Sequence, residues 1–153
     1  MNAVLQPKTG FRPMQFDDLD QIMEIEPHIY SHPWSHGNFA DSLHAGYSCW
    51  VYELEGRFIG YAVMMMVLDE AHVLNISIAA DYQGRGMGRA FLSYLIDIAR
   101  RHGAQTMFLE VRPSNLAARG LYDSMGFNEF SVRKGYYPAN HGREDAILMG
   151  LAL

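Results

Sequence analysis

Cysteine and long apolar stretches are both scarce in this chain. Cys49 is the one cysteine among 153 residues, which excludes an internal disulfide framework and a four-cysteine zinc site. No stretch approaches the roughly 20 apolar residues that span a bilayer, and the longest apolar run, Tyr61 to Leu68, has the length of a strand. The first six residues lack the basic and apolar segments of a signal peptide. We therefore expect a cytoplasmic protein with no membrane partner.

Positive charge is also in short supply. Twelve Lys and Arg stand against 17 Asp and Glu, so the net charge is −5. This balance argues against a general nucleic-acid binder, whose affinity depends on neutralising phosphates, but it is compatible with a local basic pocket for a small phosphorylated ligand. The 49% hydrophobic and 19% charged residues are typical of a globular protein and exclude an intrinsically disordered one. The length predicts one domain covering residues 1–153, and we expect a monomer.

The hydrophobic pattern predicts an α+β fold with one mixed, mostly antiparallel sheet flanked by about four helices. Asp17 is expected to cap the first helix and Pro27 to stop it. Ser35 is expected to cap the second helix, and Glu55-Gly56 to form a tight hairpin turn. Glycines are expected to end the last two helices. The predicted helices cover residues 17–26, a segment after Ser35, 87–102 and 115–125. The predicted strands cover residues 11–14, 47–54, 58–68, 72–78, 106–111, 130–134 and 146–151.

The segment between the strand that ends at Ile78 and the helix that begins near Met87 carries three glycines at alternate positions, Gly84, Gly86 and Gly88. Glycines let a backbone approach a ligand closely, and the start of a helix offers unpaired N–H groups and a positive dipole end to phosphate oxygens. The segment is therefore a candidate phosphate-binding loop.

Three known kinds of glycine-rich segment can be compared with this loop: a nucleotide-hydrolase loop, a dinucleotide-binding loop and a plain turn. The nucleotide-hydrolase loop requires Gly-Lys-Ser/Thr, but Arg89-Ala90 follows Gly88, so that interpretation fails. The dinucleotide pattern G-x-G-x-x-G is broken, although Glu110 offers the acidic residue that such folds place about 20 positions later, so a nicotinamide-cofactor site stays open. A plain turn that joins strand to helix would not need three glycines and two arginines.

The loop matches in every fixed position the pattern [R/Q]-x-x-G-x-[G/A] of the pyrophosphate loop in the GNAT family of N-acetyltransferases. The resemblance extends over nearly the whole chain. It is closest to the RimI type, bacterial enzymes that acetylate the N-terminal alanine of a small-subunit ribosomal protein. The segments that carry it are Pro33-Trp34-Ser35, Leu74-Asn75-Ile76-Ser77-Ile78, Leu109-Glu110-Val111-Arg112, Ser114-Asn115, Leu121-Tyr122, Gly126-Phe127, Tyr136-Tyr137-Pro138 and Glu144-Asp145-Ala146.

The resemblance implies that acetyl-CoA is the acetyl donor. Main-chain groups of a strand would hold the pantetheine and the thioester of acetyl-CoA, and the loop would hold its pyrophosphate. A residue at the start of a later helix would contact another part of acetyl-CoA. Carried over by position, these residues are Ile76, Ser77, Ile78, Gln83, Gly84, Arg85, Gly86, Met87, Gly88, Arg89 and Asn115.

The same resemblance implies that Glu110 is the general base and Tyr122 the general acid. Direct transfer needs a neutral amine, and an α-amine with a pKa of about 8 is neutral far more often at pH 7 than a lysine amine. Burying a carboxylate in an apolar strand is costly unless it is used or paired, which favours a function for Glu110. The alternatives are a strand-end glutamate that faces solvent or pairs with Arg112, and a tyrosine that only fills the core.

Three aromatic residues, Trp34, Tyr136 and Tyr137, are candidates for the peptide groove, although they could equally cover the sheet. His72, His102 and His141 have no ligand-like spacing with one another or with Cys49, so we expect no metal site. Cys49 is expected to be a core residue of a strand. Two other functions stay open. The protein could acetylate a small-molecule amine, or it could be a non-catalytic acyl-CoA-binding module, for which neither Glu110 nor Tyr122 would be needed.

Overall fold

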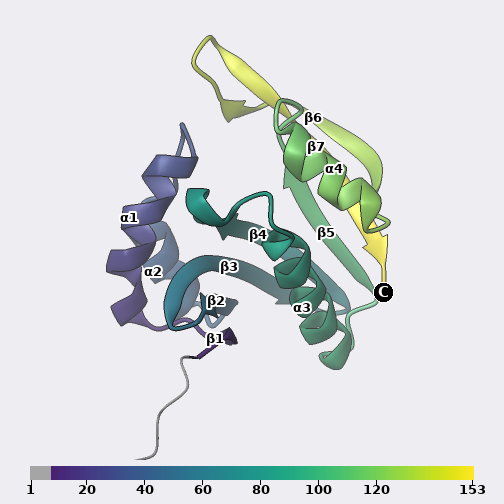
Figure 1. Cartoon of the computed structure of the whole chain (residues 1–153). Coiled ribbons are helices and arrows are strands. Elements are labelled where there is room, and N and C mark those ends of the chain that lie inside the picture. The colour runs from purple at the N-terminus through teal and green to yellow at the C-terminus, as the bar shows by residue number, and fades with distance from the viewer. Residues whose placement is uncertain (1–7) are drawn as a thin grey trace, which may run out of the picture. The chain divides into compact units, whose positions relative to one another are not determined.

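The computed structural model describes residues 8–153, which form seven strands and four α-helices joined by turns and loops (Figure 1). The prediction about a signal peptide concerns residues outside this range. The strands are β1 (Gly10–Pro13), β2 (Ser48–Leu54), β3 (Arg57–Val67), β4 (Glu70–Ile78), β5 (Thr106–Val111), β6 (Asn128–Pro138) and β7 (Arg143–Ala152). The helices are α1 (Leu19–Ile29), α2 (His36–His44), α3 (Met87–Arg101) and α4 (Leu116–Ser124).

The strands form one sheet in the order β1-β2-β3-β4-β5-β7-β6. β4 and β5 pair in parallel, whereas β1 with β2, β5 with β7 and β6 with β7 pair antiparallel. This confirms the predicted α+β fold with a mixed, mostly antiparallel sheet. The chain divides into two compact units. Among the described residues, the first unit comprises 8–63 and 75–91, and the second comprises 64–74 and 92–153.

The start of the first helix differs from the prediction. A 3-10 turn, Phe16–Asp18, precedes α1, and Gln15 and Asp18 form a capping box around that turn. Asp17 is therefore not the cap. The Asp18 carboxylate accepts the Gln15 N–H at 2.7 Å, which satisfies a donor that would otherwise be unpaired at the start of the turn.

The end of the first helix also differs, because α1 continues to Ile29 with Pro27 inside it. Proline removes one backbone donor and disfavours the helical conformation of the residue before it. Here it lies in the last turn, and the Tyr30 N–H still donates to the Glu26 carbonyl at 3.1 Å. The prediction that Pro27 stops the helix after residue 26 is wrong by three residues.

Other local predictions are confirmed. Ser35 caps α2 by accepting the Asn38 N–H at 3.1 Å. Glu55 and Gly56 form the turn between β2 and β3, both with positive φ, as a tight hairpin requires. Asn115, expected as the first residue of the last helix, instead caps α4 by accepting the Ala118 N–H at 3.2 Å.

The core of the first unit lies under α1 and α2, which Figure 1 shows side by side. Cys49 is buried there, as predicted, and burial raises the pKa of its thiol to about 11. A thiol with so high a pKa is a poor nucleophile. The core side chains are Met14, Leu19, Ile22, Phe39, Cys49, Val51, Tyr61 and Val63.

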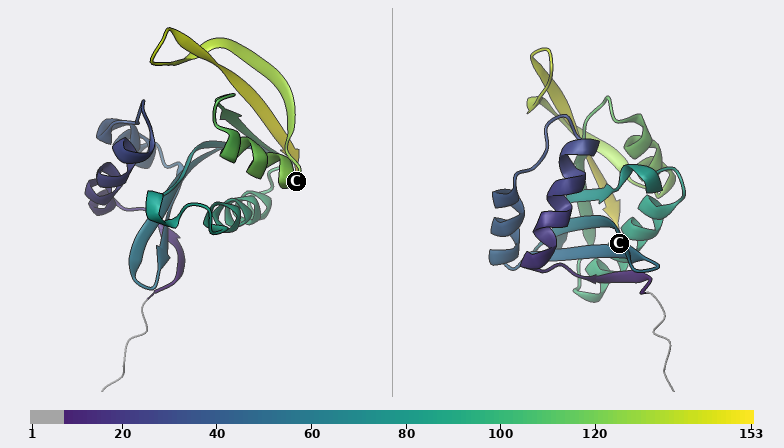
Figure 2. Two further views of the ribbon diagram at one scale, coloured as in Figure 1. Left: turned by 45° about the horizontal axis from the view of Figure 1, so that its top comes forward. Right: turned by 60° about the vertical axis from the view of Figure 1, so that its left-hand side comes forward.

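In the second unit, β6 and β7 are longer than predicted and form one long, twisted ribbon (Figure 2). β6 is an edge strand of the sheet, and nearly all of its side chains are exposed. A strand without a buried face shows little alternation of apolar and polar residues, so its ends cannot be read from hydrophobic pattern. None of the described helices is long and apolar enough to span a bilayer.

Candidate active site

The glycine loop of the first unit leads directly into α3. Gly84 and Gly86 have φ of +74° and +80°, a conformation that residues with a Cβ rarely adopt. A Cβ at either position would meet no heavy atom within 4 Å, so the loop is open on this side. The Ala90 N–H donates to the Gly86 carbonyl at 3.1 Å, while the N–H groups of the preceding turn belong to the part of a helix that has no intrahelical partners. These features suit the oxygens of a diphosphate.

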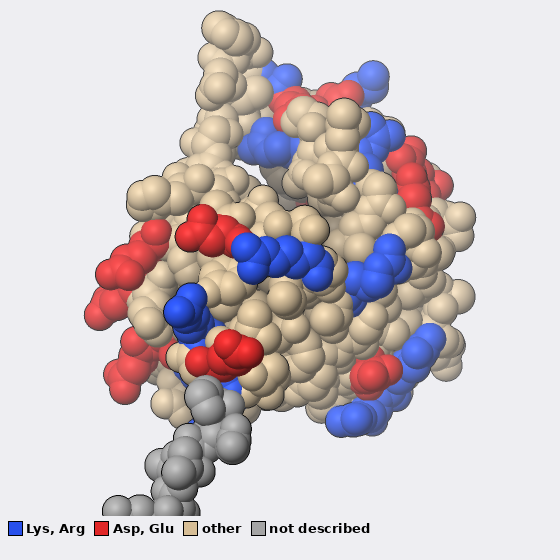
Figure 3. Space-filling model, in the orientation of Figure 1, with Lys and Arg blue, Asp and Glu red and all other residues tan. Residues whose placement is uncertain are grey.

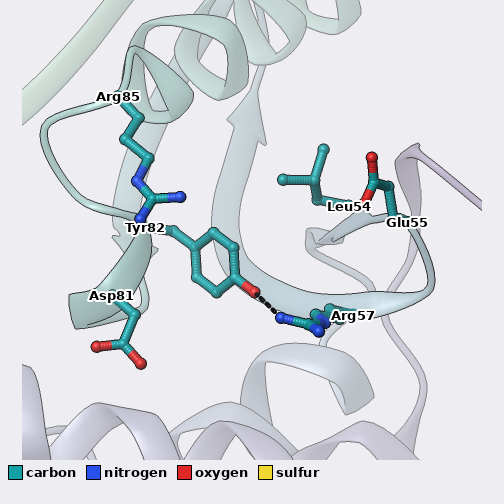
Figure 4. Close-up of a pocket in the computed structure, with 6 residues that line it drawn as sticks. All are labelled: Leu54, Glu55, Arg57, Asp81, Tyr82 and Arg85. Atoms are coloured by element: carbon teal, nitrogen blue, oxygen red, sulfur yellow. Dashed lines mark hydrogen bonds between the residues drawn. The ribbon is translucent and has the colours of Figure 1, made fainter.

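The predicted loop residues Gln83 and Arg85 have contacts within the protein. The Gln83 side chain donates to the Ile78 carbonyl at 2.9 Å, which ties the loop to the end of β4. The Arg85 guanidinium lies over the Tyr82 ring, 5.5 Å from its centroid (Figure 4). Contact of these two side chains with acetyl-CoA stays a prediction. The same is true of the predicted contacts of Met87, Gly88 and Arg89 with acetyl-CoA.

The pocket beside Tyr82 carries both signs of charge. Arg57 donates to the Tyr82 hydroxyl at 3.2 Å, and the carboxylates of Glu55 and Asp81 line the same pocket (Figure 4). Acidic and basic side chains also lie next to one another on the face shown in Figure 3. This pocket is therefore not a site selective for anions.

The end of β4 is held closely against β3. A Cβ at Gly60 would lie 2.7 Å from the Ser77 carbonyl oxygen and 2.9 Å from the Ile78 side chain, so only glycine permits this approach. Ser77 and Ile78 are buried, and the Tyr30 hydroxyl donates to the Ile76 carbonyl at 3.3 Å. Sequence reasoning missed Gly60, because an isolated glycine in an apolar strand does not reveal its neighbour.

Glu26 was also missed as a functional candidate. Its side chain is buried in the first unit and accepts hydrogen bonds from the Tyr61 hydroxyl and from the Trp34 N–H, the latter at 3.1 Å. Burial raises the pKa of the Glu26 carboxyl although these hydrogen bonds oppose the shift, and it raises the pKa of Tyr61 as well. The sequence indicated this burial, because Glu26 falls on the same face of the predicted helix as the apolar residues Leu19 and Ile22.

In the second unit, Glu110 lies on the half-buried face of β5, and 31% of its side chain is exposed. Its carboxylate is 3.5 Å from the guanidinium of Arg133 on β6. Arg112, the partner considered in the alternative interpretation, instead pairs with Glu144 at 3.1 Å and donates to the Pro138 carbonyl at 2.8 Å. The alternative that Glu110 pairs with Arg112 is therefore wrong.

Tyr122 is buried on α4, and its ring centroid lies 5.8 Å from that of Phe127. Its carbonyl oxygen accepts the N–H groups of Met125 and Phe127, which closes the helix before Gly126. The ring is thus part of the packing of the second unit. Asn115 uses its side-chain oxygen as the cap of the same helix, which leaves its amide group for other contacts.

The candidate groove aromatics have different environments. The Trp34 ring packs on Phe39 in the first unit, with centroids 5.1 Å apart. In the second unit, Tyr136 and Tyr137 meet edge to face at 4.9 Å, and Arg112 lies over the Tyr137 ring at 4.4 Å. Burial, with the charge of Glu110 adding to it, raises the pKa of Tyr137 to about 12. Tyr136 is 43% exposed and is therefore the more accessible of the two.

Within residues 8–153, no group of three or more His, Cys, Asp and Glu side chains is placed to hold a metal ion. His72, one of the histidines considered as a ligand, has a ring nitrogen 2.9 Å from the Glu70 carboxylate. Such a pair orients an imidazole without forming a metal site.

Comparisons with known proteins agree on one family. Residues 19–127 match the model of the acetyltransferase (GNAT) family. The [ribosomal protein bS18]-alanine N-acetyltransferase of Escherichia coli K12 is 42% identical over 140 residues, which cover 92% of this chain and 95% of the relative.

Two solved structures show the same likeness. The crystal structure of the E. coli ribosomal-protein-S18-alanine N-acetyltransferase matches with a TM-score of 0.88 and 41% identity, covering 95% of this chain and 94% of that one. A putative acetyltransferase, yncA, from Salmonella typhimurium with its cofactor acetyl-CoA matches with a TM-score of 0.78 and 25% identity, covering 95% and 94%.

Proposed function

Because this chain belongs to the acetyltransferase (GNAT) family, we propose that it transfers the acetyl group of acetyl-CoA to the N-terminal α-amine of alanine on a small-subunit ribosomal protein. The observation that carries the proposal is the 42% identity, over almost the full length of both chains, to an enzyme named for that reaction. The shared reaction implies a cytoplasmic setting, where ribosomal proteins are made.

The first unit supplies the groups that would hold acetyl-CoA. The N–H groups at the start of α3 and the glycine loop suit the diphosphate, and the main chain of Ile76, Ser77 and Ile78 would hold the pantetheine and the thioester. An N–H that points at the thioester carbonyl would stabilise the oxyanion that develops as the amine attacks, which is commonly the largest contribution to catalysis.

The second unit supplies the two groups that would move protons. Glu110 takes the proton that the α-ammonium must lose, directly or through water, since an α-amine with a pKa of about 8 needs only a modest base. The amine nitrogen then attacks the thioester carbon, and the C–S bond of the tetrahedral intermediate breaks. Tyr122 gives its phenolic proton to the departing thiolate, and the nitrogen of the intermediate loses its remaining extra proton, which restores the Tyr122 phenol. The products are the N-acetylated protein and coenzyme A.

The test is an assay that follows release of the coenzyme A thiol from acetyl-CoA. It compares peptides that begin with alanine in the sequence of ribosomal protein bS18, the same peptides with blocked N-termini, and small amines such as polyamines. Turnover with the free peptides alone supports the proposal. Turnover with small amines alone would contradict the substrate assignment. Binding of acetyl-CoA with no turnover of any amine would instead point to an acyl-CoA-binding module.

A further inference from the structure

The buried carboxylate of Glu26 has no role in the reaction as described above. Only 1% of this residue is exposed. Its Oε2 atom accepts the Tyr61 hydroxyl, and its Oε1 atom accepts the Trp34 N–H at 3.1 Å and the Asn75 side-chain amide at 3.4 Å. These three partners are all neutral groups. Since a buried carboxylate is costly even when it is hydrogen bonded, its presence in the core calls for a function.

From β4 to Glu26, each side chain of the network donates a hydrogen bond to the next one along the path. The Asn75 amide donates to Glu26, so the Asn75 Oδ1 atom is free to accept, and the Ser77 hydroxyl donates to it at 2.6 Å. The Ser77 oxygen must then accept from the Tyr30 hydroxyl, 2.7 Å away, whose proton is shared with the Ile76 carbonyl at 3.3 Å. Among residues 8–153, every buried side-chain nitrogen and oxygen has a partner.

The two ends of this network are main-chain groups with distinct parts in the proposed reaction. One end is the Trp34 N–H, in the turn between α1 and α2 that carries a candidate groove aromatic. The other end is the Ile76 carbonyl, in the strand proposed to hold the thioester. The Trp34 N–H and the Ile76 carbonyl both belong to the first unit. Glu26, on α1, lies between them in the hydrogen-bond network.

We propose that Glu26 is a positioning residue that fixes the acceptor-binding turn at Trp34 and the donor-binding strand at Ile76 and Ser77 relative to each other. Both carboxyl oxygens of Glu26 accept hydrogen bonds, and Oε1 accepts from the turn and from β4 at once, so one buried side chain holds both segments rigidly. Rigidity matters because an error of about 1 Å in the approach of two reactants can cost on the order of 10²-fold in rate. The kinetic part of this inference rests on the proposed function.

The kinetic test replaces Glu26 by glutamine, which keeps the shape of the side chain but exchanges one of its two accepting oxygens for an NH2 group that can only donate. We expect kcat for an alanine-starting peptide to fall roughly ten-fold or more, with KM for acetyl-CoA changing less than about three-fold. An unchanged kcat in Glu26→Gln would overturn the proposal. So would a fall in kcat that is matched by an equal loss of acetyl-CoA binding.

Two buried serines of the first unit provide a matched pair of variants. Ser77 is 3% exposed and donates to Asn75 within the network, whereas Ser42 is 5% exposed and donates to the Asn38 carbonyl at 2.9 Å outside it. Ser77→Ala should lower kcat and should be strongly non-additive with Glu26→Gln, since both interrupt one network. Ser42→Ala should leave kcat unchanged and combine additively. Equal effects of Ser77→Ala and Ser42→Ala on kcat would mean that the network only stabilises the fold, and would overturn the proposal.

A spectroscopic test needs no turnover and therefore separates this inference from the proposed function. In Glu26→Gln, NMR should show upfield movement and faster hydrogen exchange of the Trp34 amide, together with a shift of the Ile76 carbonyl carbon. Ser42→Ala should move neither signal. A change at Trp34 without one at Ile76 would overturn the proposal, because the two segments would then be held independently. If the wild-type protein fails to acetylate any peptide, the proposed function falls while this test still decides the role of Glu26.

Discussion

The carboxylate of Glu110 and the guanidinium of Arg133 lie 3.5 Å apart, so the proposed base has a cation as its neighbour. The α-ammonium of a substrate needs the same carboxylate. The arginine side chain is 54% exposed, and exposed ion pairs contribute at most about 1 kcal/mol. The guanidinium is thus a weak competitor that a substrate can displace.

Arg133→Gln should therefore lower the KM for an alanine-starting peptide, by up to about five-fold, because 1 kcal/mol corresponds to that factor. Steady-state kinetics at low ionic strength measure the effect. Lys134→Gln removes the same charge from the next residue of β6 and serves as the control. Equal changes in both variants would mean that the general field of the protein, and not the contact with Glu110, is responsible.

Glu110→Gln removes the group that is proposed to take the proton of the α-ammonium. We expect kcat/KM to fall by roughly 10²-fold, and the remaining activity to depend more steeply on the fraction of free amine as pH rises. The measurement is the pH profile of kcat/KM with the alanine-starting peptide. Acetyl-CoA binding, followed by calorimetry, should be unchanged. A variant with the wild-type pH profile would clear Glu110 of this role.

Tyr122→Phe keeps the buried ring that packs on Phe127 and removes only the hydroxyl. Loss of a general acid should lower kcat by roughly 10²-fold or more, with the affinity for acetyl-CoA near normal. Tyr47→Phe is a control for removing a phenolic hydroxyl elsewhere in the chain. If Tyr122→Phe retains full kcat, the residue is a core tyrosine and the thiolate leaves without its help.

The features that sequence reasoning identified correctly are local in the chain. Ser35 and its partner Asn38 are three residues apart, and the glycine turn that leads into α3 occupies a few consecutive positions, although its role as a phosphate site stays a prediction. A cap or a turn is determined by such short-range groups, so its pattern can be recognised in one segment.

The features that were missed depend on contacts between distant residues. Glu26 meets its partners Tyr61 and Asn75 across 35 and 49 residues of sequence. The ion pair of Glu110 with Arg133 joins β5 to β6, two strands that β7 separates in the sheet. Nothing in the sequence near Glu26 or Glu110 determines which polar group the fold will bring to it, so the alternative that paired Glu110 with Arg112 named the wrong arginine.

The glycine loop offers a comparison in which backbone strain is held constant. Gly84 has φ of +74° and Gly46 has φ of +76°, and a Cβ at either position would meet no heavy atom within 4 Å. Alanine at each position should cost a similar 1–2 kcal/mol, approximately, from the left-handed conformation. Gly84→Ala should in addition weaken acetyl-CoA binding by about ten-fold or more, because the methyl group projects where a diphosphate would approach.

Thermal unfolding and calorimetry with acetyl-CoA measure both quantities for the two variants. Similar losses of stability with a loss of affinity only in Gly84→Ala would support the loop as the diphosphate site. Unaltered affinity in Gly84→Ala would place the diphosphate elsewhere.

The ion pair between Arg12 and Asp18 should make stability depend on pH. Burial alone would raise the pKa of Asp18, but hydrogen bonds from the Arg12 guanidinium at 2.7 and 2.9 Å and from the Gln15 N–H outweigh it and lower the pKa below its usual 3.8. A carboxylate whose pKa is lower in the folded state contributes stability above its unfolded pKa and loses it as pH falls through the folded value.

Asp18→Asn should therefore reduce the free energy of unfolding by about 1–3 kcal/mol near neutral pH, since the side chain is nearly buried and its main partner is charged. The difference between wild type and variant should shrink as pH falls below 3.8, because the wild-type carboxyl then gains a proton and loses its advantage. Urea unfolding at a series of pH values measures it. Asp17→Asn, at the exposed neighbouring residue, should show no such convergence. A difference for Asp18→Asn that stays constant down to low pH would mean that the charge of Asp18 does not contribute to stability.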